Sequence, residues 1–406
     1  MTKILFFDSA STTRCCDAAA KLMSQFATEE YGNPSSSHHY GQQAAKAIKE
    51  ARAYFADIYK VSPDQIIFTG SGSEADNLAI YGVAMDALIK QKANPGSPPP
   101  RILTTAIEHA AVRKTVQSLA PFGIEVHFVP VDENAQVNRD RFLELLTPNT
   151  VLVSIQQVNN IVGSQLPVED LAKLAKQKVP TLIFHTDAVQ AFCKVKQPTA
   201  SSEIDLVSVS AHKIQGPKGV GALIVLNKKL LKQGIRPLIW GGEQEGGFRS
   251  GTQSPGLISG FHIAAKSCLE KIEATRNQIS SLRDRFRTLL TEKSLLSGPK
   301  SKVRWNSPSD AVPHIVSLSV PGYPSGPLAK LLEERGCLVS TGSACSSHKM
   351  EPDPVLSSMG LPPEISQSAI RISFSSENTP QDVDTLAQAI DESIRLMTDL
   401  LGGRGR

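Results

Sequence analysis

Short apolar runs alternate with helical segments from residue 42 to residue 226, and this alternation constrains the fold more than any other feature. The runs are rich in β-branched residues, as buried strands are, whereas the segments between them carry apolar residues three and four positions apart. Strands that alternate with helices form a mostly parallel sheet with right-handed crossovers. The sequence therefore predicts an α/β domain with strands at 65–69, 101–106, 125–131, 150–158, 181–185, 206–210 and 222–226, and helices at 42–59, 78–88 and 168–178.

Polar and charged side chains follow the carboxyl ends of several of these strands. In an open parallel sheet such ends converge on one crevice, where α/β proteins bind their ligands. We therefore expect a single site that combines amide, imidazole, carboxylate and amine groups. Its candidate members are His109, Asn160, Asp187, Gln190, His212 and Lys213.

Lys213 is the most informative of these residues. It ends the run SVSAHK, which leads from a strand into a turn rich in glycine and proline. A lysine at a buried strand end is costly unless its amine is neutral or is used covalently, for example in a Schiff base with a carbonyl cofactor. The alternative is an ordinary surface lysine in a loop, which is the commoner situation for this residue type.

A turn of glycine and serine, GSGSEADN at 70–77, lies between the strand at 65–69 and the next helix. Free backbone N–H groups and the positive end of a helix can hold a phosphate group at such a turn. An ordinary helix N-cap uses the same residue types, so that alternative stays open. No lysine follows the glycines, and the turn is therefore not the phosphate loop of a nucleotide hydrolase.

Charge and cysteine content exclude several classes of function. The net charge is only +4, without a long run of like charges, which gives no support for nucleic acid or a membrane surface as a partner. No apolar run reaches 18 residues, and the N-terminus lacks the pattern of a signal peptide. The six cysteines are scattered, which argues against a disulfide framework or a structural zinc site, and we expect a cytoplasmic protein.

Ten motifs occur in order along the chain: FFDSASTT, YGNPSSSHHYG, FTGSGSEADNLAI, EHAAV, SIQQVNN, HTDAVQ, SVSAHKIQGPKGVGAL, FRSGTQ, VSTGSACSS and SAIRISF. Together they resemble the NifS- and IscS-like cysteine desulfurases of the class V aminotransferase family of pyridoxal-phosphate enzymes, over about residues 4–397. The resemblance implies the fold type I of these transferases, a large domain with a mostly parallel central sheet plus a smaller α+β domain. It further implies an N-terminal arm at 1–15 that packs with the small domain, a large cofactor-binding domain at 16–260, and a small C-terminal domain at 261–406 that carries the catalytic cysteine loop.

The resemblance also implies a role for each candidate side chain. Lys213 would bond covalently to the aldehyde of pyridoxal 5'-phosphate, and Asp187 would pair with the ring nitrogen so that the ring acts as an electron sink. His109 would lie against the ring and transfer protons. Gln190 would bind the ring oxygen, and Asn160 would contact both cofactor and substrate. The phosphate would be held by Gly72, Ser73, Ser210, His212 and, across a homodimer interface, Thr252.

The resemblance also implies which residues bind the substrate and which residue is the nucleophile. Asn33, Asn160 and Arg371 would bind the L-cysteine substrate, with the guanidinium as a two-donor fork for its carboxylate. A salt bridge at a strand end is the alternative for Arg371. Cys345 lies in a run of small residues that offers no apolar pocket. A structural cysteine needs such a pocket, so this position suits a reactive thiol. Lys213, His109 and Cys345 would be the catalytic residues, without a resident metal, although the Cys345 persulfide could transiently ligate an iron–sulfur cluster.

The activity implied is conversion of L-cysteine to L-alanine with sulfur left as a persulfide on Cys345. That sulfur would pass to an iron–sulfur scaffold or another acceptor protein, including a tRNA-thiolation relay. A selenocysteine lyase, or another class V aminotransferase or lyase, is the alternative. Four residues depart from the family pattern: Ile161 replaces a usual acidic residue, Gly72-Ser73 replaces Ala-Thr, and Ala211 stands where glycine is frequent.

Overall fold

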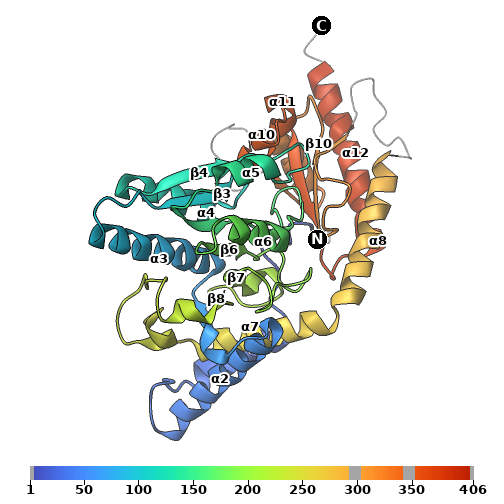
Figure 1. The fold of residues 1–406 in the computed structure, drawn as a ribbon. Coiled ribbons are helices and arrows are strands. Elements are labelled where there is room, and N and C mark those ends of the chain that lie inside the picture. The colour runs from blue at the N-terminus through green and yellow to red at the C-terminus, as the bar shows by residue number, and fades with distance from the viewer. Residues whose placement is uncertain (1–3, 292–302, 342–352, 403–406) are drawn as a thin grey trace.

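The computed structural model describes residues 4–291, 303–341 and 353–402, which form two units, each built on a sheet (Figure 1). In the seven-stranded sheet of the first unit, β8 is antiparallel to both of its neighbours and the other adjacent strands are parallel. The predicted mostly parallel α/β sheet is therefore confirmed. In spatial order the strands are β2 (Ile66–Thr69), β8 (Gly221–Val225), β7 (Leu206–Ser210), β6 (Ile183–Asp187), β5 (Thr150–Ser154), β3 (Arg101–Thr105) and β4 (Glu125–Val129).

Helices cover both faces of this sheet, because alternate residues of each strand point to opposite sides. Ile66 and Phe68 of β2 belong to the core that contains Phe55, whereas Ile67 belongs to the core that contains Leu78. Buried apolar side chains on both faces explain why the strands are continuous β-branched runs in the sequence. The helices of the first unit are α1 (Asp17–Thr28), α2 (His39–Tyr59), α3 (Gly72–Ala93), α4 (Ala110–Leu119), α5 (Arg139–Leu145), α6 (Val168–Lys178) and α7 (Pro255–Glu270).

The second unit has its own sheet and its own apolar core. Its four strands are β12 (Ser340–Thr341), β13 (Ala369–Ser373), β10 (Ile315–Ser319) and β9 (Arg304–Trp305), all paired antiparallel. Figure 1 shows α8 and α12 running side by side along this unit. Its helices are α8 (Ile272–Thr291), α9 (Ser325–Glu334), α10 (Pro354–Ser358), α11 (Pro363–Gln367) and α12 (Pro380–Gly402).

The N-terminal segment packs against this second unit. Strand β1 (Leu5–Phe6) pairs in parallel with β11 (Cys337–Leu338), and Asp8 forms a bridge with Ser373 of β13. Residues 10 and 11 then continue to the cavity of the first unit, as described below. The N-terminal segment therefore links the second unit to the candidate site.

The long helical stretch expected from residue 261 to residue 293 is two helices, because the chain breaks at Lys271 between α7 and α8. Phe261 and Ala264 of α7 are buried in the core of the first unit, whereas Phe286 of α8 is buried in the core of the second. Domain limits at 16–260 and 261–406 stay predictions, and the packing of α7 favours a boundary at Lys271. Within the described ranges no helix combines the length and apolar character that crossing a membrane requires.

Candidate active site

A cavity of about 610 Å³ opens where the strands β2, β3, β5, β6 and β7 end. The polar side chains expected to converge at the carboxyl edge of the sheet do lie together here. Of the residues predicted to form the site, those lining this cavity are Gly72, Ser73, His109, Asn160, Asp187, Gln190, Ser210, His212, Lys213 and Arg371.

Lys213 ends the 3-10 turn η3 (Ala211–Lys213), which follows directly on β7. Its Nζ donates hydrogen bonds to the backbone carbonyls of Ala10 at 2.6 Å and Ser11 at 2.7 Å. Burial, followed by the nearby charge of Lys194, lowers the pKa of Lys213 to about 7. A large fraction of the amine is therefore neutral near pH 7, which is the form that attacks a carbonyl group.

Asp187 is the last residue of β6 and is only 6% exposed. Its Oδ1 accepts a hydrogen bond from the backbone N–H of Val189 at 2.9 Å. Burial raises the pKa of Asp187, and this effect outweighs the opposing attraction to Lys213 and to His109 in its protonated form. A cationic group bound in the cavity would stabilise the charged carboxylate further, since opposite charges are strongly coupled when removed from water.

His109 caps the N-terminus of α4, where its Nδ1 accepts a hydrogen bond from the backbone N–H of Ala111 at 3.1 Å. That bond fixes the orientation of the ring and leaves the proton of the neutral imidazole on Nε2. Removal from water by the surrounding protein lowers the pKa of His109. The ring is therefore mainly neutral at pH 7 and presents an N–H donor.

The start of α3 forms the part of the cavity that suits an anion. Ser71 caps the helix, because its hydroxyl accepts a hydrogen bond from the backbone N–H of Glu74, and the first N–H groups of a helix lack partners within the helix. A Cβ at Gly72 would lie only 2.7 Å from Val189 Cγ2, so a side chain there would collide with the wall. The hydroxyl of Ser210 is buried beside Gly72 and has no hydrogen-bond partner among the described residues.

Arg371 lies in β13 of the second unit and is 4% exposed. Its Nη1 donates to the carbonyl of Asn160 at 2.9 Å, and its Nη2 donates to Asp8 Oδ1 at 2.8 Å and Ser11 Oγ at 2.6 Å. The salt bridge considered as an alternative from the sequence is thus present. Arg371 also lines the cavity, and its Nε is buried without a hydrogen-bond partner among the described residues.

Two of the predicted site residues that the structure describes, Thr252 and Asn33, do not line this cavity. Thr252 is exposed and lines a separate cavity of about 170 Å³ with Gly70 and Arg249. Asn33 is exposed in the loop before α2, where its Oδ1 accepts a hydrogen bond from the backbone N–H of Ser35. Cys345 lies outside the described residues. The roles assigned to these three side chains stay predictions.

Comparison with known proteins decides the family. The family model "Aminotransferase class-V" matches residues 5–386. The chain belongs to this family. A relative within it is the cysteine desulfurase IscS of Clostridium botulinum (strain Hall), which is 35% identical over 401 residues and covers 97% of this chain and 95% of its own. The resemblance to cysteine desulfurases found in the motifs is therefore confirmed.

Solved structures agree with this class V assignment. A NifS-like protein is 34% identical, superposes with a TM-score of 0.86, and covers 97% of this chain and all of its own. The structure titled SspA in complex with cysteine is 30% identical, with a TM-score of 0.78, and covers 92% of this chain and 99% of its own. The fold expected from the resemblance is confirmed by these neighbours.

This class V chain has three buried carboxyl residues at the cavity that the sequence analysis did not assign, namely Asp76, Glu108 and Asp353. Asp76 is 1% exposed, and Glu108 is 3% exposed and accepts hydrogen bonds from the Thr105 hydroxyl and the Gln156 backbone. Burial raises the pKa of Glu108 to about 8 and the pKa of Asp76 well above its usual range. Their places in the motifs GSGSEADN and EHAAV were a usable signal, but burial was not visible in the sequence.

Proposed function

We propose that this chain is a pyridoxal-phosphate-dependent cysteine desulfurase that converts L-cysteine to L-alanine. The observation that carries the proposal is the meeting of the Lys213 amine, the buried Asp187 carboxylate and the Arg371 guanidinium at one cavity. The desulfurase names of the relatives and the cysteine complex of one structural neighbour support the choice of substrate.

The residues present fit this cofactor. A phosphate group matches the open helix start at Gly72 and Ser73 and the unpartnered hydroxyl of Ser210. A protonated ring nitrogen matches the buried carboxylate of Asp187, and an aldehyde matches the partly neutral amine of Lys213. When bound, the cofactor ring supplies an electron sink for the bond broken at the substrate α-carbon.

Side chains of this protein carry out the remaining steps of the reaction. Arg371 and Asn160 bind and orient the substrate carboxylate, and the neutral Lys213 amine takes the α-proton. His109, held by the backbone of Ala111, keeps an N–H donor on the cavity side. The thiolate of Cys345 then attacks the substrate sulfur, so that the carbon–sulfur bond breaks and a sulfur–sulfur bond forms. The substrate β-carbon gains a proton, and the α-carbon regains the proton held by Lys213, to give L-alanine.

The titration of Lys213 gives a prediction for cofactor uptake. The rate at which the apoprotein takes up pyridoxal phosphate should rise with pH and level off above a midpoint of about 7. The direction follows because only the neutral amine attacks the aldehyde, and the neutral form is populated above the pKa. Stopped-flow absorbance after mixing measures this rate, and a midpoint near that of an ordinary lysine would contradict the account.

Arg371 gives a prediction for substrate affinity. The variant Arg371→Gln should raise KM for L-cysteine by about 10–100-fold, which corresponds to the loss of a charge-assisted hydrogen bond to the carboxylate. Arg371→Lys keeps the charge without the fork and should fall between this variant and the wild type. Steady-state kinetics, with melting temperatures to monitor the lost Asp8 ion pair, measure the effect. An unchanged KM in both variants would contradict the assignment.

We further propose a homodimer in which Thr252 contributes to the partner's site. Thr252 is exposed and does not line the candidate active site of its own chain, and the segment before it exposes Trp240 by 74% and Ile239 by 41%. Large exposed apolar side chains of this kind typically mark interfaces. Trp240→Asp should shift the protein toward the mass of one chain in light scattering, whereas a wild type that already has that mass would contradict the proposal.

The same proposal assigns the downstream role. Sulfur held on Cys345 would supply iron–sulfur cluster assembly, through a scaffold or another acceptor protein, in the cytoplasm. The described cysteines are all free thiols, which supports a reducing compartment. The direct test is a product assay: L-cysteine and a reductant should yield L-alanine and sulfide in equal amounts without a keto-acid acceptor. A requirement for such an acceptor would instead indicate an aminotransferase.

A further inference from the structure

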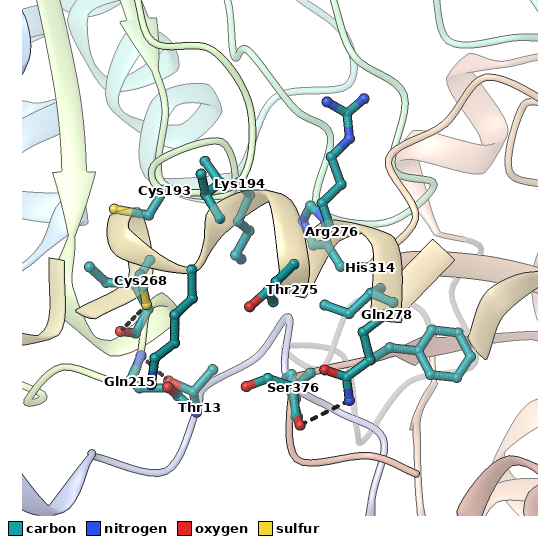
Figure 2. A pocket seen from close by; sticks show the side chains of 18 of the residues that line it. Thr13, Cys193, Lys194, Gln215, Cys268, Thr275, Arg276, Gln278, His314 and Ser376 are labelled. Atoms are coloured by element: carbon teal, nitrogen blue, oxygen red, sulfur yellow. Dashed lines mark hydrogen bonds between the residues drawn. The ribbon is translucent and has the colours of Figure 1, made fainter. Parts of the chain in front are cut away.

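A second cavity, of about 360 Å³, lies where the two units meet. Its walls come from the break between α7 and α8, the segment around Lys194 and the turn η3, together with residues 313–314 and 374–376. Figure 2 shows Lys194 on one side of this cavity and Thr13, Gln215 and Ser376 on the opposite side. Its volume falls within the range of small-molecule sites. Lys213 lines both this cavity and the candidate active site.

The walls of this cavity are cationic. Its basic lining residues are Lys194, Lys213, Lys271 and Arg276, and no aspartate or glutamate occurs among the described residues that line it. Cys193 and Cys268 add no negative charge, because burial raises the pKa of Cys268 to about 11 and that of Cys193 well above its usual range. A concave surface lined by one sign of charge concentrates ions of the opposite sign.

Lys194 is the inner cation of this set. Its amine has one long contact, 3.5 Å to Gln190 Oε1, and no carboxylate partner within the described part of the chain. Lys271 and Arg276 are exposed at the rim, and Figure 2 shows the Arg276 guanidinium pointing away from Lys194. Lys194 is partly buried, and a cation partly removed from water without a counter-charge is costly, so its position favours an anionic ligand.

The rest of the lining combines apolar side chains with polar ones, some of which are already hydrogen-bonded, such as Thr13 and Gln278. Ile214, Ile279 and Phe374 are buried and offer an apolar surface. His314 is 6% exposed, and its Nε2 has no hydrogen-bond partner among the described residues. An inorganic ion would leave the apolar surface uncovered, whereas an organic acid would use both kinds of wall.

We propose that this second cavity binds a small organic carboxylate, whose charged group pairs with Lys194 and whose apolar part packs on Ile214, Ile279 and Phe374. The site is distinct from the one used for L-cysteine and does not depend on the proposed desulfurase activity. A ligand bound here would also affect the candidate active site, because Lys213 lines both cavities and the charge of Lys194 helps lower the pKa of Lys213. An anion paired with Lys194 would weaken that influence and favour the charged form of the Lys213 amine.

The test uses 4-bromobenzoate as the probe and the protein with its cofactor. Calorimetry should detect binding by the wild type, about ten-fold weaker binding by Lys194→Met, and a change within about three-fold for Lys194→Arg. Lys196→Met is the matched control, since this exposed lysine does not line the cavity, and it should bind as the wild type does. The neutral analogue 4-bromobenzamide should bind at least about ten-fold more weakly to the wild type.

Anomalous diffraction from a soaked crystal locates the bromine. We expect it between Lys194 and Phe374, and Thr275→Trp, which fills the cavity without changing its charge, should remove that peak. A peak only beside Arg371, equal binding of acid and amide, or undiminished binding by Lys194→Met would overturn the proposal. Binding at crystal concentration only, without a calorimetric signal in solution, would also overturn the proposal. Each of these results is independent of whether the protein forms alanine.

Discussion

Replacing Lys213 with alanine should abolish covalent attachment of pyridoxal phosphate and lower the rate of alanine formation by about 10²–10⁴-fold. The variant loses the amine that bonds to the aldehyde and that takes the substrate α-proton. Gly72, Ser210 and Asp187 remain, so the cofactor should still bind without a covalent link. The visible absorbance of the protein, before and after removal of loosely bound cofactor by dialysis, measures the difference.

Two further variants separate chemistry from charge and folding. Lys213→Arg keeps a positive charge on this wall but cannot supply a neutral amine, and should be nearly as inactive. Lys218→Ala removes an exposed lysine five positions along the same loop and should leave absorbance and rate unchanged. Retention of the covalent absorbance and of near wild-type activity by Lys213→Ala would show that another group carries the cofactor.

Replacing Cys345 with serine should leave cofactor binding intact and reduce sulfide release from L-cysteine by about 10²-fold or more. A thiolate attacks a sulfur atom and keeps it as a persulfide, whereas a hydroxyl group is far less acidic and forms no such stable product. Addition of L-cysteine should still change the visible spectrum of this variant, because substrate binding involves other residues.

The matched control for that experiment is Cys15→Ser, which changes a partly buried thiol that does not line the candidate active site. It should release sulfide at the wild-type rate. Full sulfide release by Cys345→Ser would contradict the assignment of the nucleophile. An equal loss in both variants would point to a general effect of serine substitution and equally remove the support for Cys345.

The fold was largely predictable because its central strands are buried on both faces. That burial requires unbroken β-branched runs, which is why the strand ending at Ser210 matches its predicted limits. The helix 168–178 also matches, because its apolar residues recur three and four positions apart. The break at Lys271 was missed for a physical reason: no glycine or proline marks it, and the helical pattern continues across it. The second cavity, which depends on this break, could not be foreseen either.

The sequence predicted the site residues that lie at strand ends. It did not predict the contacts that join residues far apart in the chain. His109, Asp187 and Lys213 follow strands of one sheet, so topology alone brings them together. The contact between Asp8 and Arg371 joins residues 363 positions apart, and nothing local in the sequence specifies it. The raised pKa of Glu108 likewise arises from burial, which only the folded chain defines.

The most direct test of the central claim is to find which lysine carries the cofactor. Borohydride reduction of the purified protein, followed by peptide mass spectrometry, fixes pyridoxal phosphate to the amine that holds it. We predict a phosphopyridoxyl group on Lys213 in one copy per chain. Burial lowers the pKa of Lys194 to about 8, which makes this residue the nearest competitor. Label on Lys194 instead, or no label on either lysine, would contradict the account.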